Sequence, residues 1–272
     1  PENYQLDALT QITNIYFTMN KWDKVEQYAD ELIVLSNILL QSEKHRTIGK
    51  RPYEKLVIDK PLVTYYGYGY LMKGTALEYQ GSYEESMKCV LAYSDLSWIE
   101  GLDEKEQLVV ERYHMWSTAN ALTLEILMGN TSVLIEYTLL LQENPEEVLR
   151  GLLTITKAAN EHGFTIDDII ENFHDTIHKI GDPYSELSND YKDLFSLINF
   201  ADLCYQIAIY KFDKQKYREG MKNLLQSFTI YASINKKSET IDSMSLFEKY
   251  REFSSKEELE EYDRIIKRRC NN

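Results

Sequence analysis

The sequence predicts an all-α protein built as a solenoid of stacked helical hairpins, and three observations favour this fold. Gly and Pro are scarce, with 11 and 5 in 272 residues, whereas all-β folds need many tight turns rich in both. Apolar residues recur at helical spacing along most of the chain. Short polar turns separate these stretches and recur in similar form, which is the pattern of a repeat protein.

The first helix pair is predicted within residues 12–32, ITNIYFTMNKWDKVEQYADEL. Its apolar residues keep a spacing of three and four, which places them on one face of a helix. The polar segment NKWD interrupts the pattern, which then resumes. The apolar positions are Ile12, Ile15, Tyr16, Met19, Val25, Tyr28, Ala29 and Leu32.

A second pair is predicted within residues 71–93, LMKGTALEYQGSYEESMKCVLAY. Gly74 lies in its first helix and the turn is QGSY. Gly81 supplies the left-handed backbone conformation that commonly ends a helix. Val90 and Tyr93 continue the apolar face of the second helix.

These two stretches resemble tetratricopeptide repeats. That motif has a small residue in the first helix, a bulky aromatic residue directly after the turn, and a small or modest residue three positions later. The matching residues are Thr13 and Gly74, Trp22 and Tyr83, and Val25 and Ser86. The resemblance implies a right-handed superhelix in which the first helix of each pair lines the concave side.

Three fainter copies follow, and each departs from the motif in some respect. In the first of them Leu122 replaces the small residue; in the second, Gly163 is aligned with Gly81; in the third, Tyr217 matches the aromatic residue but the turn has no glycine. The copies lie at 120–141, 152–173 and 203–228.

We therefore expect a single repeat domain over residues 1–272. An extended connector is expected at 42–62, which carries two prolines and a basic bias. The expected hairpins lie near 5–40, 65–97, 106–142, 146–180 and 190–232, followed by capping helices at 240–270.

The composition restricts the partners of such a chain. The net charge is −14 and the sequence pI is about 4.9, and nucleic-acid affinity comes mainly from Lys and Arg on phosphates. We therefore do not expect these residues to bind DNA or RNA by themselves.

Cysteine usage and hydropathy indicate a cytoplasmic protein. Cys89, Cys204 and Cys270 are widely spaced and odd in number, which favours reduced thiols over a disulfide framework or a zinc site. No apolar run approaches the roughly 18 residues that span a bilayer, and no signal sequence precedes the first helix. We expect neither a metal nor a cofactor.

The predicted concave groove is lined by residues that suit a peptide. Side-chain amides donate and accept hydrogen bonds and so pair with peptide bonds, while Tyr and Trp offer large, rigid surfaces. Arg150 and Lys157 would hold a carboxylate. The expected groove residues are Asn14, Phe17, Tyr68, Trp116, Asn120, Thr123, Arg150, Lys157, Asn160, Tyr205 and Gln206.

Tyrosine is abundant, with 21 copies, and it is concentrated in VTYYGYGYLM at 63–72. Tyr65, Tyr66, Tyr68 and Tyr70 point in different directions from one helix, so they cannot all be buried on a single face. We expect one or two of them to face the groove or a partner.

The patterns that carry catalysis are weak. His174 and His178, in HDTIH, lie one helical turn apart and could grip a metal ion, but Asp175 stands where a metalloprotease has Glu. Acidic pairs such as Asp167–Asp168 fall at helix starts, where they favour the helix dipole. No phosphate-binding loop, GxSxG or EF-hand pattern occurs, so we expect no enzyme.

The chain as a whole resembles the C-terminal repeat region of Gram-positive helix-turn-helix regulators, such as the peptide-pheromone receptors of the Rap, NprR and PlcR type. The degenerate hairpins, the Tyr- and Asn-rich composition and the phrase YLMKGTALEYQGSYEESMKC carry this resemblance. It implies a ligand-sensing regulatory domain, in which a short signalling peptide lodges in the groove and shifts conformation or dimer packing. A DNA-binding domain is then expected upstream of Pro1, since no helix-turn-helix occurs here.

Two alternatives stay open. The first is a constitutive protein–protein adaptor with neither a signalling peptide nor a link to DNA. The second is an enzyme on a repeat scaffold that uses His174 and His178. A homodimer is expected only from how common homodimers are.

Overall fold

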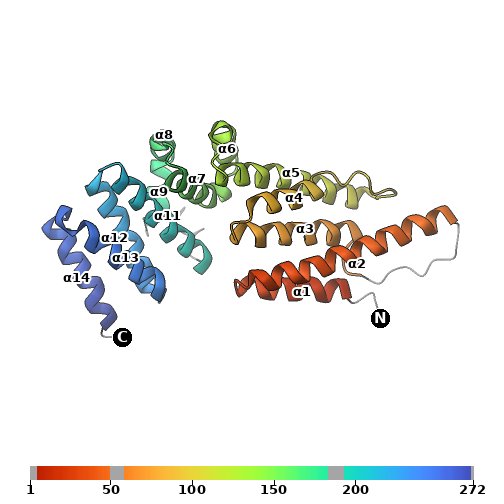
Figure 1. Cartoon of the computed structure of the whole chain (residues 1–272), viewed down its shortest axis with the longest axis horizontal. Coiled ribbons are helices and arrows are strands. Elements are labelled where there is room, and N and C mark those ends of the chain that lie inside the picture. The colour runs from red at the N-terminus through yellow and green to blue at the C-terminus, as the bar shows by residue number, and fades with distance from the viewer. Residues whose placement is uncertain (1–4, 50–57, 183–192, 271–272) are drawn as a thin grey trace. The chain divides into compact units, whose positions relative to one another are not determined.

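The structure is a computed structural model that describes residues 5–49, 58–182 and 193–270; for 43–49 and 268–270 it describes the backbone alone (Figure 1). The described part is all-α, as predicted, with thirteen α-helices packed as sequential antiparallel pairs. None of these helices combines the length and apolarity needed to cross a membrane. The chain divides into two compact units, Pro1–Met128 and Gly129–Asn272.

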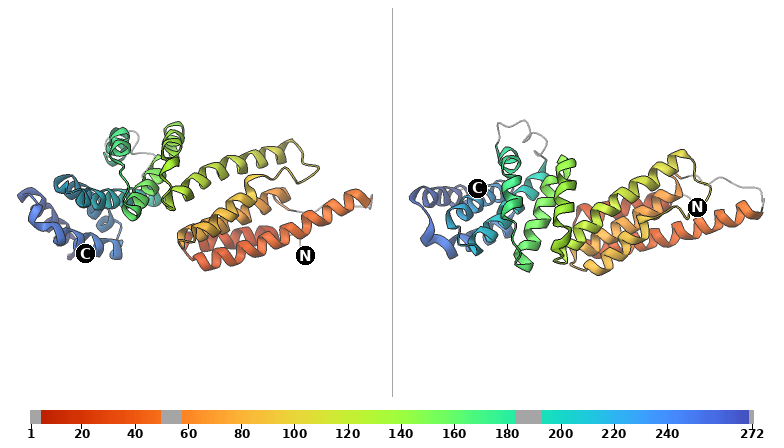
Figure 2. Two further views of the ribbon diagram at one scale, coloured as in Figure 1. Left: turned by 45° about the horizontal axis from the view of Figure 1, so that its top comes forward. Right: turned by 90° about the horizontal axis from the view of Figure 1, so that it is seen from above.

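The first unit contains five helices that follow one another as neighbours. Helix α2 packs on α1 and α3, and α4 packs on α3 and α5; both views of Figure 2 show this succession from red to yellow-green. The helices are α1 (Gln5–Thr18), α2 (Trp22–Gly49), α3 (Leu62–Tyr79), α4 (Tyr83–Ser94) and α5 (Glu104–Leu127).

The expected extended connector at 42–62 is wrong in its first part, because helix α2 continues to Gly49. The segment 42–49, SEKHRTIG, contains neither proline nor glycine before its last residue, so nothing in it interrupts the helical hydrogen bonds. Residues 50–57 of the expected connector lie outside the described residues.

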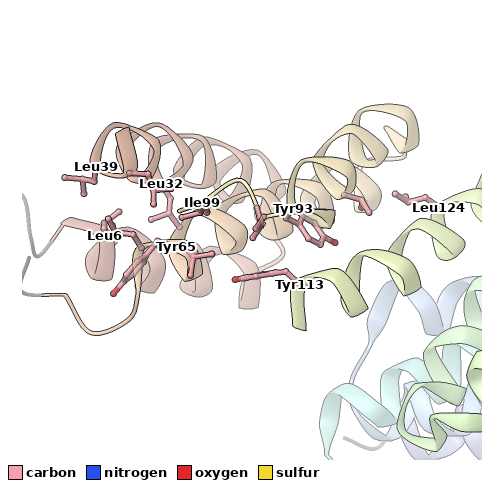
Figure 3. Packing of buried hydrophobic residues seen from close by; sticks show 13 residues of the cluster. Leu6, Leu32, Leu39, Tyr65, Tyr93, Ile99, Tyr113 and Leu124 are labelled. Carbon is pink, nitrogen blue, oxygen red and sulfur yellow. The ribbon is translucent and has the colours of Figure 1, made fainter. Parts of the chain in front are cut away.

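The core of the first unit joins all five helices. Figure 3 shows Leu6, Leu32, Tyr65, Tyr93 and Tyr113 among its buried side chains. The Tyr113 hydroxyl donates a hydrogen bond of 2.9 Å to the carbonyl of Thr64. The tyrosine-rich helix α3 therefore contributes to this core, but unequally: Tyr65 is 1% exposed, whereas Tyr66, Tyr68 and Tyr70 are half-buried.

The second unit contains the remaining helices. Helix α7 packs on α11, α12 packs on α11 and α13, and α14 packs on α12. Their bounds are α6 (Leu134–Glu143), α7 (Val148–His162), α8 (Asp167–Asn172), α9 (His174–Gly181), α11 (Leu194–Asp213), α12 (Tyr217–Ser233), α13 (Lys237–Tyr250) and α14 (Lys256–Cys270).

The division between the units affects the predicted hairpin near 106–142. Its two helices, α5 and α6, belong to different units, because the boundary falls at Met128, directly after α5. The first residues of the hairpin expected at 190–232 lie outside the described part, which resumes at Asp193. That residues 1–272 form one continuous repeat domain stays a prediction.

The core of the second unit is centred on α12, which aromatic side chains from three helices enclose. Phe247 stacks on Tyr262 at 3.8 Å between ring centroids, and Phe212 stacks on Tyr250 at 4.1 Å. Phe228 of α12 is 1% exposed and packs beside Tyr262. Burial of aromatic rings provides much of the stability of such a unit.

Four turns between consecutive helices share one backbone arrangement. A residue with positive φ ends the first helix, and the N–H of the next residue donates to the carbonyl five positions earlier, as in a Schellman motif. The positive-φ residues are Asn20 (54°), Gly81 (76°), Gln215 (58°) and Asn235 (59°). The hydrogen bonds are Lys21 to Tyr16 (3.0 Å), Ser82 to Leu77 (2.8 Å), Lys216 to Lys211 (2.8 Å) and Lys236 to Tyr231 (3.0 Å).

The first three of these turns place an aromatic residue at the first position of the next helix. Trp22 stacks on Tyr79 at 4.2 Å, and Tyr217 stacks on Phe253 at 3.7 Å. Gln215 therefore supplies the left-handed residue in the turn that lacks glycine. Gly163, predicted to match Gly81, likewise ends its helix with a positive φ, of 76°, but its turn is longer, because α8 begins four residues after it rather than two.

The shared turn predicts opposite effects for two exchanges. Gly81→Gln should lower the free energy of unfolding by about 1 kcal/mol, because a side chain disfavours positive φ. Gln215→Gly should raise it by roughly 0.5 kcal/mol for the same reason. Urea unfolding of both variants checks this.

Gln80→Gly is the matched control, because Gln80 has a φ of −87° in the same turn as Gly81. It should destabilise the chain slightly, since glycine gains freedom only in the unfolded state there. Stabilisation by Gln80→Gly, or destabilisation by Gln215→Gly, would contradict the assignment.

Candidate binding site

A pocket of about 190 Å³ lies within the second unit, among helices α7, α11, α12 and α13. It is smaller than the roughly 300–1,000 Å³ of typical small-molecule sites, so it matches one side chain rather than a large ligand. The lining residues are Lys157, Asp202, Tyr205, Gln206, Tyr231, Glu239 and Asp242.

Helical spacing explains how these residues meet. Asp202, Tyr205 and Gln206 are separated by three and four positions, so they share one face of α11. Glu239 and Asp242 are three apart and share a face of α13. Because α11, α12 and α13 are joined by two of the shared turns, at Gln215 and Asn235, these faces are brought to one side of the unit.

The side-chain amide of Asn160 links α7 to α11 beside the pocket. Asn160 Nδ2 donates hydrogen bonds to both the backbone carbonyl and Oε1 of Gln206, each of 2.9 Å. The two bonds hold the Gln206 side chain in one orientation. They leave its Nε2 group as the donor that a ligand could use.

Tyr231 and Asp202 are hydrogen-bonded to each other in the wall of the pocket. The Tyr231 hydroxyl donates to Asp202 Oδ1 at 2.5 Å, and Tyr231 is 3% exposed. Burial, followed by the charge of Asp202, raises the pKa of the Tyr231 phenol above its ordinary value. The phenol therefore stays a neutral donor, and it fixes one carboxylate oxygen of Asp202.

The α13 side of the pocket carries Glu239 and Asp242. Burial acts to raise the pKa of Glu239, but its backbone amide and the Lys236 ammonium, 3.1 Å away, together hold that pKa below its ordinary value. Burial and the charge of Asp242 raise the pKa of Tyr205. Near neutral pH the pocket therefore has an ionised Glu239 and a neutral Tyr205.

The structure gathers four of the five groove residues predicted in the second unit. Lys157, Tyr205 and Gln206 line the pocket and Asn160 holds Gln206. Arg150 lies on an exposed position of α7 and is not a lining residue. Four lining residues were not predicted from the sequence: Asp202, Tyr231, Glu239 and Asp242. Of these, only Asp202 could have been found, because it lies three positions before Tyr205 and so shares its helix face.

In the first unit, two of the predicted groove residues, Asn14 and Tyr68, contact each other. The Tyr68 hydroxyl donates to Asn14 Oδ1, and burial raises the pKa of Tyr68 to about 12. Phe17 packs edge-on against Trp22 at 5.5 Å. Asn14 and Tyr68 therefore link α1 to α3, and Phe17 packs α1 against α2.

The remaining predicted groove residues lie on α5. Asn120 Nδ2 donates to the Tyr93 hydroxyl at 2.8 Å, and Trp116 packs edge-on against Tyr113 while staying 38% exposed. Thr123 is only 5% exposed. The prediction that Thr123 faces a groove is wrong, because the Thr123 side chain lies on the buried side of α5, as do those of Leu122 and Leu124.

The groups considered for catalysis are separate from this pocket. His174 and His178 lie with ring centroids 6.4 Å apart, and both are exposed. Within the described residues, no group of three or more His, Cys, Asp or Glu side chains is placed to hold a metal ion.

Cys89 and Cys204 are buried free thiols, and burial raises the pKa of Cys89 to about 11. The side chain of Cys270 lies outside the described part.

An ion-pair network supports the end of α11 that leads into α12. Asp167 accepts hydrogen bonds from Lys216 Nζ at 2.8 Å and from the Tyr210 hydroxyl at 3.3 Å. Lys211, 8% exposed, lies between Asp167 at 3.5 Å and Glu219 at 2.9 Å. The network fixes the start of α8 to the turn between α11 and α12.

In comparisons with protein-family models, with curated proteins and with solved structures, no match to this chain was found.

The Asp167 network predicts a pH-dependent loss of stability. Its hydrogen bond from Lys216 is the main cause that holds the pKa of Asp167 below its ordinary value, against burial. The ionised carboxylate therefore contributes stability above the unfolded pKa of about 3.9, and this is lost as the pH falls through the folded pKa. Asp167→Asn should lower the free energy of unfolding by about 1–2 kcal/mol at pH 7, since it removes partly exposed charge-assisted bonds.

Urea unfolding at pH 7 and at pH 3 checks this. The difference between the wild type and Asp167→Asn should be smaller at the lower pH. Asp168→Asn, at the neighbouring exposed position, should stay within about 0.5 kcal/mol of the wild type at both. An equal loss for Asp167→Asn at both pH values would exclude the carboxylate charge as the cause.

Proposed function

We propose that this chain is a tetratricopeptide-like solenoid that binds an extended peptide segment, with the pocket among α7, α11, α12 and α13 as the anchor for one of its side chains. The single observation that carries the proposal is the convergence of Lys157, Tyr205 and Gln206 on that pocket. The three residues supply an ammonium, an aromatic surface and an amide, which is the chemistry that a peptide needs. They were expected on one wall from the repeat register alone.

The turn arrangement at Asn20, Gly81, Gln215 and Asn235 supports the repeat part of the proposal. A helix pair that reverses in so few residues cannot bury its own apolar face, so successive pairs stack on one another. In such arrays the binding surface is built from the first helix of each pair. Helices α7 and α11, which supply five of the lining and supporting residues, hold that position in the proposed repeats.

We propose further that peptide binding regulates this protein's conformation, as the resemblance to peptide-sensing regulators suggests. A peptide that binds one arrangement of the helices better than another shifts the population toward it. With a net charge of −14, this chain would pass the signal to a separate DNA-binding part rather than contact DNA itself.

The adaptor alternative makes a different prediction. A constitutive adaptor holds its partner without needing a change of shape, whereas a sensor requires different affinities for two states. Small-angle scattering of the chain with and without a bound peptide separates the two. An unchanged scattering curve at saturation favours the adaptor.

Peptide binding is tested by selecting a random heptapeptide library on the immobilised chain and measuring the recovered peptides by calorimetry. Gln206→Ala should weaken binding by about 1–2 kcal/mol, roughly 5–30-fold, since it removes a fixed amide partner. The melting curve should be close to that of the wild type, because Gln206 is only partly buried.

Gln226→Ala is the matched control, since Gln226 is a half-buried glutamine of α12 that is not a lining residue. It should leave the affinity within about twofold of the wild type. If no peptide is recovered, or if both variants bind as the wild type does, the proposed site is wrong.

A further inference from the structure

The pocket has an unequal charge balance. Its walls carry three carboxylates, Asp202, Glu239 and Asp242, and one ammonium, Lys157. A concave site with an excess of one charge concentrates the field of that charge and attracts the opposite one. The balance therefore favours a cation over the carboxylate that sequence analysis expected Lys157 to hold.

Two of these carboxylates have no cation of their own. Glu239 is paired with Lys236 at 3.1 Å, but among the described residues neither Asp202 nor Asp242 has an ion-pair partner within 4.0 Å. Elsewhere in the unit, by contrast, Asp167 and Glu219 converge on Lys211. Asp202 is partly buried and Asp242 is exposed, so a ligand cation bound between them would have two carboxylates as counter-charges without having to displace another cation.

The aromatic walls suit the rest of a cationic side chain. Tyr205 and Tyr231 both line the pocket, and aromatic rings bind the aliphatic stem of Lys or Arg as well as its charge. The Tyr231 hydroxyl is already engaged by Asp202 Oδ1. The second oxygen of Asp202 is thus the acceptor left for a ligand.

A metal ion fits these carboxylates poorly. No group of three or more His, Cys, Asp or Glu side chains in the described part is placed to surround one, and Ca²⁺ or Mg²⁺ needs at least six oxygen ligands at about 2.0–2.6 Å. An ammonium or guanidinium group can instead bridge acceptors that lie further apart, because its donors point in several directions.

We propose that this pocket binds a cationic group of the peptide, with Asp202 and Asp242 as its counter-charges and Tyr205 and Tyr231 around its stem. The proposal rests on the peptide-binding function above and names the ligand chemistry of that same site. The cation is the ammonium or guanidinium of a Lys or Arg side chain, or the terminal ammonium of the peptide. Gln206 and Lys157 are then placed to bind main-chain carbonyl groups beside it.

The first experiment uses a small probe and needs no peptide. Nα-acetyl-lysine N-methylamide and its norleucine counterpart, which lacks the charge, are titrated into the chain and followed by nuclear magnetic resonance. The lysine compound should cause saturable shifts at Tyr205 and Gln206, and the norleucine compound should not. Equal responses to the two compounds would overturn the proposal.

The counter-charges are tested with Asp202→Asn/Asp242→Asn, which keeps an acceptor for the Tyr231 hydroxyl. This variant should weaken the lysine compound about tenfold or more, because both charges that face the cation are lost. The control is Asp168→Asn/Asp263→Asn, which changes the net charge equally at two exposed positions of the same unit. If both double variants weaken binding alike, the effect comes from net charge and the proposal fails.

The second experiment separates the sources of the cation with heptapeptides selected on the wild-type chain. Replacing the peptide's Lys or Arg by norleucine should weaken binding about tenfold if the side chain occupies the pocket, and N-terminal acetylation should do so if the terminus does. Peptides that bind equally well after both changes would overturn the cation site while keeping peptide binding. Failure to select any peptide, with the lysine compound still bound, would overturn peptide binding and keep the cation site.

Discussion

Four of the chain reversals in this protein depend on one backbone arrangement, in which a residue of positive φ is followed by an N–H that donates to the carbonyl five residues earlier. It occurs at Asn20, Gly81, Gln215 and Asn235. Because it ends one helix and begins the next within three residues, the two helices must lie antiparallel and in contact. A pair so tightly joined leaves an apolar face uncovered, and the following helix covers it. Helix pairs joined in this way contribute to the cores of both units.

The pocket is a consequence of the same constraint. Two of these turns join α11, α12 and α13, so side chains about 30 positions apart, such as Asp202 and Tyr231, lie within hydrogen-bond distance. Helix α7 reaches this group from earlier in the chain and is held by the bonds from Asn160 to Gln206. Several polar residues around the pocket thus position one another, and among its three carboxylates only Glu239 has an ion-pair partner within the described part.

Much of the fold could be predicted because its signals are local. Helical periodicity and the turn residues identified the helix pairs, and the register placed Lys157, Tyr205 and Gln206 together on one surface. The errors arose where local signals were weak. Thr123 is buried because a shift of one position turns a helical residue by about 100°, and α2 continues through residues 42–49 because charge alone does not end a helix.

The sequence by itself determined the helices, their order and the turns that join them, since these depend on residues within a few positions of one another. Only the tertiary structure decided which charges share a pocket. Glu239 and Asp242 are about 80 positions from Lys157 in the chain, and no periodicity relates helices that far apart. Their approach to Lys157 depends on how four helices pack. The same packing sets the balance of charge that determines what the pocket attracts.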